Sequence, residues 1–152
     1  MSNNTEVIGK GGVLIEGAIE APILISKQGF NGVAAWTKEE NFKDGHEAVC
    51  YDWQHEWNGV DLKGKIIAFP TEVGSTHAPL PYIDLVKDKN GPAGIIVTVP
   101  DPLVAIGVII SKEWYGPSIP LIEFPIDELE KHVKNGDIVQ IQEDGTISIK
   151  KS

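Results

Sequence analysis

Between residues 65 and 125, short apolar runs alternate with segments that have the marks of helices. The runs, each of the length of a buried strand, are Lys65–Phe69, Gly94–Thr98 and Ile119–Ile122. One helix is predicted to end at Asn90-Gly91. A second is predicted over Leu103 to about Lys112, because Asp101 can cap it and Pro102 suits its first turn. Strands joined through helices lie parallel in one sheet, so the alternation predicts an α/β fold.

Further strands are predicted at both ends of the chain. Two short β-like runs, Gly12–Glu16 and Ala21–Ile25, are bounded by glycine and proline. After a third predicted helix, about Ile126 to Lys134, the runs Asp137–Ile141 and Thr146–Ile149 flank a turn with the composition of a β-hairpin. The sequence thus predicts short parallel βα units closed by antiparallel terminal strands. No repeat or long linker interrupts the pattern, so we expect residues 1–152 to form a single domain.

The segment from Ser26 to Gly64 is polar, aromatic and only weakly periodic, with one possible short strand near Ala48–Tyr51. A stretch that long without regular structure is unusual inside a compact domain, and it usually has a function or is covered by a partner. Tryptophan is enriched where protein surfaces meet, and core packing accounts for one or two of the four tryptophans. We expect those of this segment to contact a partner: Trp36, Trp53 and Trp57.

The charge balance restricts the partners. The 152 residues include 13 basic and 22 acidic side chains, which gives a net charge of −9. Such a chain repels phosphate backbones and anionic lipids, so nucleic acid and membrane partners are disfavoured. The first residues lack the apolar core of a signal peptide, and no apolar run is long enough to cross a bilayer. We therefore expect a cytoplasmic protein.

Two kinds of binding side chain are scarce. All the basic residues are lysine, so no guanidinium is available for two-point binding of a carboxylate or phosphate. Cys50 is the single cysteine, so this chain alone cannot hold a cluster that needs several thiolates; we expect its thiol to be buried and inert. His46, Cys50 and His55 have ligand side chains, but their spacing matches no zinc motif, and we predict no metal site.

The stretch from Phe69 to Pro81 joins a predicted buried strand to the next helix. Ligands of α/β sheets gather beyond the carboxyl ends of strands, where the start of a helix favours an anion. The amides of Gly74, Ser75 and Thr76 are suited to stabilise negative charge on the Ser75 hydroxyl. The alternative is structural: Gly74 forms the turn, and Ser75 or Thr76 caps the helix.

The Gly74-Ser75-Thr76 turn is the most specific of several short motifs between about residues 10 and 125. The others are Asp52, His55, Gly59, Gly64-Lys65, Pro92–Ile96, Asp101-Pro102, Ala105–Gly107 and Ile119–Leu121. Together they resemble the small subunit, or swivelling domain, of the aconitase X type dehydratases. Two features depart from the pattern of that family. The segment Gln28–Ala35 lacks an Asp-Pro pair, and His77 with two prolines follows the turn in place of small residues.

The resemblance implies a swivelling β/β/α domain that acts as the small subunit of a hydro-lyase. It implies a large catalytic subunit that carries an iron–sulfur cluster, and a small hydroxy acid as substrate, such as phosphomevalonate or cis-3-hydroxyproline. The serine after the glycine of the turn is the catalytic base in that family, which corresponds to Ser75. Lys27 falls where the family has a lysine close to the substrate; the simpler interpretation is a solvated charge. His55 falls in a loop that orients the active-site segment; the simpler interpretation is a loop histidine with satisfied hydrogen bonds. The other candidate binding residues of the turn are Gly74, Thr76 and His77.

Two other functions remain open. Phosphohistidine swivelling domains have a similar architecture and a Thr-Ser-His-Ala motif near a helix start, which Ser75–Ala78 resembles. His77 would then carry the phosphoryl group. Those domains usually have an arginine soon after the histidine, whereas this chain continues with Pro79-Leu80-Pro81. The remaining possibility is a non-catalytic binding or scaffold module.

Overall fold

The structure of the protein, a computed structural model, describes residues 4–43 and 47–151, so His46 lies outside the described residues. Within these ranges, eight strands form one sheet in the order β1-β8-β7-β3-β4-β5-β6-β2. The strands are β1 (Thr5–Lys10), β2 (Gly12–Ile15), β3 (Ile19–Ile25), β4 (Ile66–Phe69), β5 (Gly94–Val97), β6 (Leu121–Glu123), β7 (Ile138–Ile141) and β8 (Thr146–Lys150). The helical segments are α1 (Gly32–Trp36), η1 (Glu39–Phe42), α2 (Pro79–Lys87), α3 (Pro102–Ile110), η2 (Ser111–Tyr115) and α4 (Ile126–Leu129).

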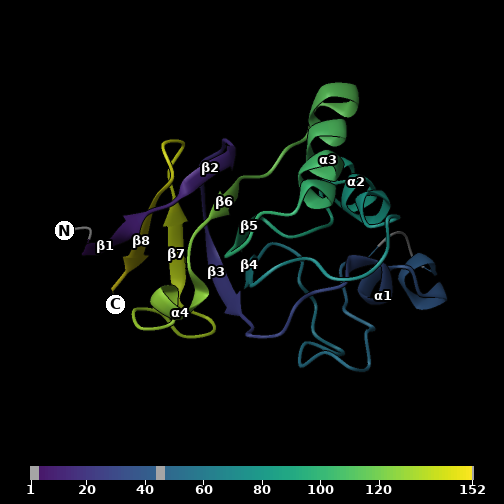
Figure 1. Cartoon of the computed structure of the whole chain (residues 1–152), viewed down its shortest axis with the longest axis horizontal. Coiled ribbons are helices and arrows are strands. Elements are labelled where there is room, and N and C mark those ends of the chain that lie inside the picture. The colour runs from purple at the N-terminus through teal and green to yellow at the C-terminus, as the bar shows by residue number, and fades with distance from the viewer. Residues whose placement is uncertain (1–3, 44–46, 152) are drawn as a thin grey trace.

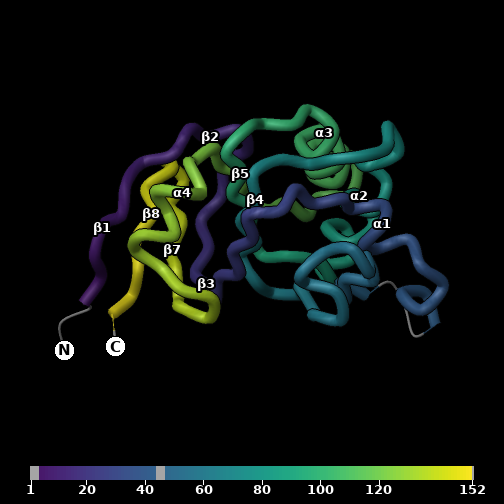
Figure 2. Tube along the Cα trace, turned by 60° about the horizontal axis from the view of Figure 1, so that its bottom comes forward, coloured from purple at the N-terminus to yellow at the C-terminus, as the bar shows by residue number. Residues whose placement is uncertain are grey.

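Strand β3 belongs to both halves of this sheet. Its first residues pair antiparallel with β7, and its last residues pair parallel with β4. Strands β7, β8 and β1 continue the antiparallel half. Strands β4, β5 and β6 are parallel, with β2 antiparallel at the edge. The β1–β8 pair lies at the end of the molecule away from α2 and α3 (Figures 1 and 2). The predicted parallel βα units closed by antiparallel strands are confirmed.

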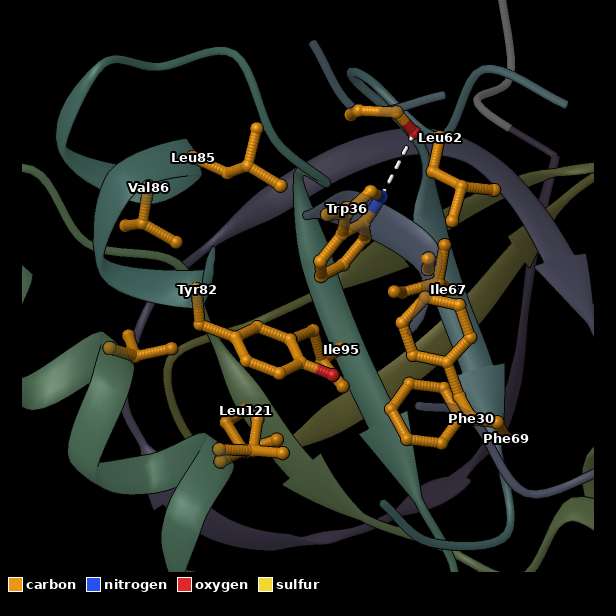
Figure 3. Close-up of a cluster of buried hydrophobic side chains, with 14 of the residues drawn as sticks. Phe30, Trp36, Leu62, Ile67, Phe69, Tyr82, Leu85, Val86, Ile95 and Leu121 are labelled. Carbon is orange, nitrogen blue, oxygen red and sulfur yellow. Dashed lines mark hydrogen bonds between the residues drawn. The ribbon is translucent and has the colours of Figure 1, made fainter. Parts of the chain in front are cut away.

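The parallel strands divide their side chains between two hydrophobic cores. Ile66 and Ile96 belong to a core shared with the antiparallel strands. Ile67 and Ile95, one residue before or after them, belong to a core under the helices (Figure 3). Successive residues of a strand point to opposite faces, so both faces of β4 and β5 are buried. This burial explains why the two strands are uninterrupted apolar runs in the sequence, and it produces a β/β/α layering.

The segment from residue 26 to residue 64 contains a helix that its pattern did not indicate. Helix α1 begins after Asn31, whose side-chain oxygen accepts the Ala34 amide at 3.0 Å. The strand expected near Ala48–Tyr51 is wrong: an isolated bridge between Val49 and Asp61 lies there instead. The helix depends on a cap three residues away, and the bridge depends on pairing with a residue further along the chain. Neither contact leaves a periodic pattern in the sequence.

Two of the three tryptophans expected at an interface are core residues. Trp36 is fully buried, and its indole N–H donates to the Ala48 carbonyl at 3.1 Å (Figure 3). Trp57 is 3% exposed. Both correct the expectation, because their rings fill the core under α1 and α2. Trp53 is 75% exposed, and its contact with a partner stays a prediction. Cys50 is fully buried, as expected.

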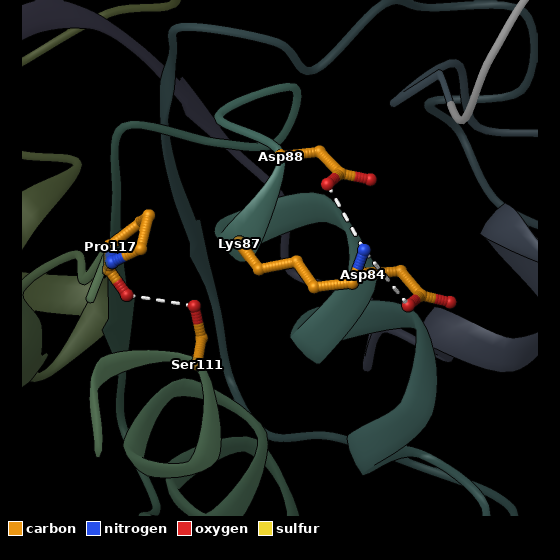
Figure 4. A network of polar contacts seen from close by, with 5 residues as sticks. All are labelled: Asp84, Lys87, Asp88, Ser111 and Pro117. Atoms are coloured by element: carbon orange, nitrogen blue, oxygen red, sulfur yellow. Dashed lines mark hydrogen bonds and ion pairs between the residues drawn. The ribbon is translucent and has the colours of Figure 1, made fainter. Parts of the chain in front are cut away.

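The helix over Leu103–Lys112 is largely confirmed. Asp101 caps it, because its carboxylate accepts the Leu103 amide at 2.7 Å. The α-helical part ends at Ile110, and the chain continues through the wider turn η2. The Ser111 hydroxyl in this turn donates to the Pro117 carbonyl at 2.7 Å (Figure 4). On the neighbouring α2, the Lys87 ammonium lies 3.0 Å from Asp88 and 3.8 Å from Asp84.

The helix expected over residues 126–134 is shorter than predicted. Helix α4 ends at Leu129, and turns carry the chain to Asn135. The side chain of Asn135 accepts the Ile25 amide at 2.8 Å, and the Gly136 amide donates to the Ile23 carbonyl at 2.8 Å. These bonds hold Asn135 and Gly136 against β3, just before β7 begins. The chain must therefore leave the helix before Lys134.

Helices α2 and α3 approach each other most closely at Gly107. A Cβ atom there would lie 2.8 Å from the Pro79 carbonyl oxygen and 2.8 Å from the Tyr82 Cβ. Contacts this short require the backbone to move, because neither neighbour is the end of a flexible side chain. Gly107 therefore fixes the position of the first turn of α2, where the loop after β4 ends.

We expect Gly107→Ala to lower the free energy of unfolding by about 1–3 kcal/mol, the usual cost of overpacking. Alanine is a better helix former than glycine by about 1 kcal/mol. A lower free energy of unfolding in the variant would therefore come from the close contact between α2 and α3 and not from helix propensity. Urea denaturation monitored by tryptophan fluorescence measures the effect. The matched control is Ile106→Ala on the exposed face of the same helix, which should cost less. A Gly107→Ala midpoint equal to that of the wild type would contradict the interpretation.

Candidate functional site

The carboxyl ends of the parallel strands meet at one edge of the sheet. A pocket of about 330 Å³ opens there, and its lining comes from the segments that follow β3, β4, β5 and β6. The lining residues are Lys27, Pro70, Thr98, Pro125, Ile126 and Asp127. Because ligands of α/β sheets bind at this edge, we take it as the candidate functional site. Ser75 lies on the loop that leaves Pro70, and it is not among the residues that line this pocket.

The loop after β4 is paired with the segment after β3. The Phe30 amide donates to the Thr71 carbonyl at 3.1 Å, and the Val73 amide donates to the Phe30 carbonyl at 2.9 Å. Gly74 follows with a φ of +113°, which L side chains rarely adopt, and a Cβ there would lie 2.4 Å from the Asn31 side-chain nitrogen. Glycine is therefore required at the turn, both for its backbone angle and for the space it leaves.

Ser75 does not cap helix α2. The helix begins after Ala78 with Pro79 in its first turn, and no side chain caps it. The Ser75 hydroxyl oxygen instead accepts the His77 amide at 3.1 Å and lies 3.0 Å from Nδ1 of the His77 ring. The structural alternative of a Ser75 or Thr76 cap is thus wrong. The amide that reaches the Ser75 oxygen is that of His77; the roles of Gly74 and Thr76 as anion-binding amides stay a prediction.

A buried carboxyl group lies directly before this turn. Glu72 is 7% exposed. Its Oε1 accepts the Gly32 amide at 2.8 Å, and its Oε2 accepts the Tyr82 hydroxyl at 2.6 Å. The carboxyl group thus joins the loop after β4 to the starts of α1 and α2. Burial raises the pKa of Glu72 to about 7, against the opposing effect of both hydrogen bonds, and the nearby charge of Asp101 raises it further.

Sequence reasoning missed Glu72. An acid in a polar loop is ordinarily a solvated charge, and the one available signal is its position two residues before Gly74. Its partners lie 40 residues before it and 10 residues after it. No local pattern links those positions, so only the folded structure identifies the group.

His55 is buried and held by neighbouring groups. Its Nδ1 accepts the Trp57 amide at 3.1 Å, so the ring proton of the neutral form is on Nε2, which lies 3.5 Å from the Ser26 hydroxyl oxygen. That hydroxyl accepts the Gln28 amide at 3.0 Å and donates to the Glu56 carboxylate. Burial lowers the pKa of His55. The arrangement suits a histidine that orients its loop against the end of β3.

Lys27 is a mostly exposed residue, and its ammonium lies 2.9 Å from the Glu130 carboxylate. The hydrogen bond with Glu130 raises the pKa of Lys27. Its side chain lines the 330 Å³ pocket and also a neighbouring pocket of about 550 Å³. In the described residues, no hydrogen bond or ion pair joins Ser75 to Lys27 or His55. The structure brings together Gly74, Ser75 and His77, and it places Lys27 and His55 on the neighbouring segments.

Within the described ranges, 4–43 and 47–151, no group of three or more histidine, cysteine, aspartate or glutamate side chains is placed to hold a metal ion. No helix in the same ranges has the length and apolar character needed to cross a membrane.

Comparison with known proteins relates the chain to one group of enzymes. The family model of the aconitase X swivel domain matches residues 8–149. The phosphomevalonate dehydratase small subunit of Methanosarcina acetivorans is 30% identical over 87% of this chain and 83% of its own. The cis-3-hydroxy-L-proline dehydratase of Pseudomonas aeruginosa is 31% identical over 51% of this chain, which is 13% of that enzyme. The crystal structure of aconitase X from Thermococcus kodakaraensis superposes with a TM-score of 0.76, at 24% identity, over 93% of this chain and 97% of that one.

The raised pKa of Glu72 predicts a pH dependence of stability. An acid whose pKa rises from 4.5 unfolded to about 7 folded binds more protons in the folded state between these pH values. The free energy of unfolding should therefore fall as the pH rises through this window, by up to about 3 kcal/mol from this group. Glu72→Gln keeps an uncharged group there and should remove this part of the dependence.

Urea titrations at several pH values measure the difference between wild type and Glu72→Gln. The variant should gain stability relative to the wild type as the pH rises from about 5 to 8. Glu143→Gln in the exposed turn between β7 and β8 is the matched control and should leave the pH profile unchanged. Parallel profiles of Glu72→Gln and the wild type would show that this carboxyl group is ionised normally.

Proposed function

Because the chain belongs to the aconitase X swivel domain family, we propose that it is the small subunit of a hydro-lyase that removes water from a small hydroxy acid. The proposal rests above all on the 30% identity with a phosphomevalonate dehydratase small subunit over 83% of that protein's length. A hydroxyl on a glycine turn at the carboxyl edge of the sheet supports it. Phosphomevalonate and cis-3-hydroxy-L-proline, which the relatives' names give, define the substrate class.

We assign the role of base to Ser75. Dehydration of a hydroxy acid requires a base that removes a proton from carbon while the hydroxyl group leaves. The Ser75 hydroxyl is partly exposed, its loop is fixed by the Phe30 pairing, and its oxygen accepts one amide hydrogen bond. These features keep the oxygen at one position while leaving it open to a substrate. Lys27, on the neighbouring pocket, is the candidate to meet an anionic group of the substrate.

The other half of the site belongs to the proposed large subunit. With lysine as its only cation and a net charge of −9, this chain is poorly suited to bind a carboxylate or phosphate alone. Its single, buried cysteine does not fit an iron–sulfur cluster. We propose that the large subunit holds the cluster, whose iron would polarise the leaving hydroxyl as a Lewis acid. The large subunit would also supply the guanidinium groups.

Exposed apolar side chains around the turn support a partner that covers it. Val73 precedes Gly74, Leu80 lies in the first turn of α2, and Val99 follows β5; their exposed fractions are 44%, 56% and 57%. Several such side chains on neighbouring segments are typical of a surface that another protein covers. The large subunit would exclude water from the site by covering these residues.

The relatives described above include a dehydratase and a dehydratase subunit, which favours this function over a phosphohistidine carrier or a scaffold module. The direct test is to purify the chain together with its large subunit and supply phosphomevalonate and cis-3-hydroxy-L-proline. Loss of one water, detected by mass spectrometry, is expected with one of them and only when both subunits are present. Turnover by this chain alone, without iron, would reject the proposal.

We expect Ser75→Ala to lower kcat of the assembled enzyme by at least about 10³-fold, because the base is removed. Copurification with the large subunit should be unchanged. Ser118→Ala, at the opposite edge of the parallel strands, is the matched control and should keep wild-type turnover. A kcat of Ser75→Ala close to that of the wild type would remove Ser75 from the mechanism.

A further inference from the structure

The chain contains two serine–histidine pairs of different construction. In the first, the Ser26 hydroxyl is buried; it accepts the Gln28 amide, donates to Glu56, and lies 3.5 Å from the ring of His55. A hydroxyl group offers one donor and two acceptor positions, so Ser26 has no position left for a ligand. This pair is part of the folded framework.

The second pair, Ser75 and His77, is at the surface and leaves a position open. The Ser75 oxygen accepts the His77 amide at 3.1 Å, and the same oxygen lies 3.0 Å from Nδ1 of the His77 ring. With the ring proton on Nε2, the hydroxyl donates its hydrogen to Nδ1. One acceptor position of the Ser75 oxygen is then occupied by an amide, and the other remains available to a substrate proton.

We propose that His77 is a further catalytic residue, which takes the Ser75 hydroxyl proton as Ser75 takes a proton from the substrate. The inference rests on the proposed function and extends it, because it names the group that makes an ordinary serine hydroxyl basic enough. An adjacent imidazole is a common activator of a serine hydroxyl.

The step balances without any additional reactant. The substrate C–H bond breaks, its proton forms an O–H bond with Ser75, and the original hydroxyl proton forms an N–H bond with Nδ1 of His77. The C–H electron pair becomes the second bond of the new C=C, and the C–O electron pair leaves with the hydroxide. The proton on His77 then passes back through Ser75 or to solvent and completes the water molecule. Nothing is oxidised or reduced.

In this chain the proton acceptor beside Ser75 is His77, whereas a cation that held a permanent alkoxide would have to come from the proposed large subunit. An alkoxide needs a cation close to it. Among the described residues, no lysine forms a hydrogen bond or ion pair with Ser75, and the chain has no arginine. The His77 ring is exposed, so Nε2 can exchange its proton with solvent between turnovers.

The test compares two substitutions of His77 in the assembled two-subunit enzyme, with phosphomevalonate and cis-3-hydroxy-L-proline as substrates. His77→Ala removes the ring. His77→Asn keeps a hydrogen-bond acceptor near the position of Nδ1 but cannot take a proton. Both should lower kcat by about 100-fold or more with KM changed by less than about threefold. Added imidazole should restore part of the kcat of His77→Ala.

His132→Asn, on the turn after α4, is the matched control and should keep wild-type kcat. A His77→Asn enzyme within about threefold of wild-type kcat would overturn the inference, because His77 would then only position the serine. Loss of kcat in His77→Ala with no response to imidazole, together with loss of the large subunit on purification, would also overturn it. An inactive wild-type pair rejects the proposed function itself, whereas an active wild type with active His77 variants rejects only the role of His77.

Discussion

The turn that carries Ser75 depends on Phe30, a residue of the segment that leaves β3. The backbone of Phe30 pairs on one side with Thr71 and Val73, which turns the loop after β4 into a short strand-like element. Its buried ring packs against four other rings, those of Trp36, His55, Trp57 and Phe69. One residue thus joins the backbone of the candidate site to the core under the helices. Movement of the turn would require that aromatic cluster to repack, which a close-packed interior resists.

A part of the fold could be predicted from the sequence where its burial leaves a local pattern. Strands β4 and β5 are buried on both faces, so each is a continuous apolar run that is recognisable without knowledge of its neighbours. The segment from residue 26 to residue 64 has no such local signal. Trp36 and Trp57 stabilise it through contacts with residues distant in the chain, and such contacts leave no pattern in the neighbouring sequence. Strand β1 (Thr5–Lys10) also has no local signal in the sequence. Most of its side chains are exposed, and the strand is defined by its backbone pairing with β8.

The residues of the candidate site also divide into those with a local sequence signal and those defined by tertiary contacts. Gly74 and Ser75 are visible in the sequence because a backbone angle that favours glycine is a local property. The role of Glu72 could not be predicted from the sequence, because its carboxylate binds the Gly32 amide and the Tyr82 hydroxyl, which only the fold brings close to it. The buried carboxyl group and the Phe30 pairing hold the same loop from two sides. The sequence therefore predicts where the hydroxyl lies along the chain, and the tertiary contacts determine how firmly it is held.

The charge of the chain distinguishes two ways of using such a hydroxyl. A lasting alkoxide is an anion, and the net charge of −9 and the absence of arginine in this chain disfavour it. Passing the proton on to His77 places a positive charge on the imidazole while the serine oxygen returns to a neutral hydroxyl. The same net charge disfavours a substrate carboxylate, which in the proposed enzyme would bind to cations of the large subunit. In the proposed enzyme the two chains would divide the charges: this chain would take the proton, and the large subunit would bind the anionic groups of the substrate.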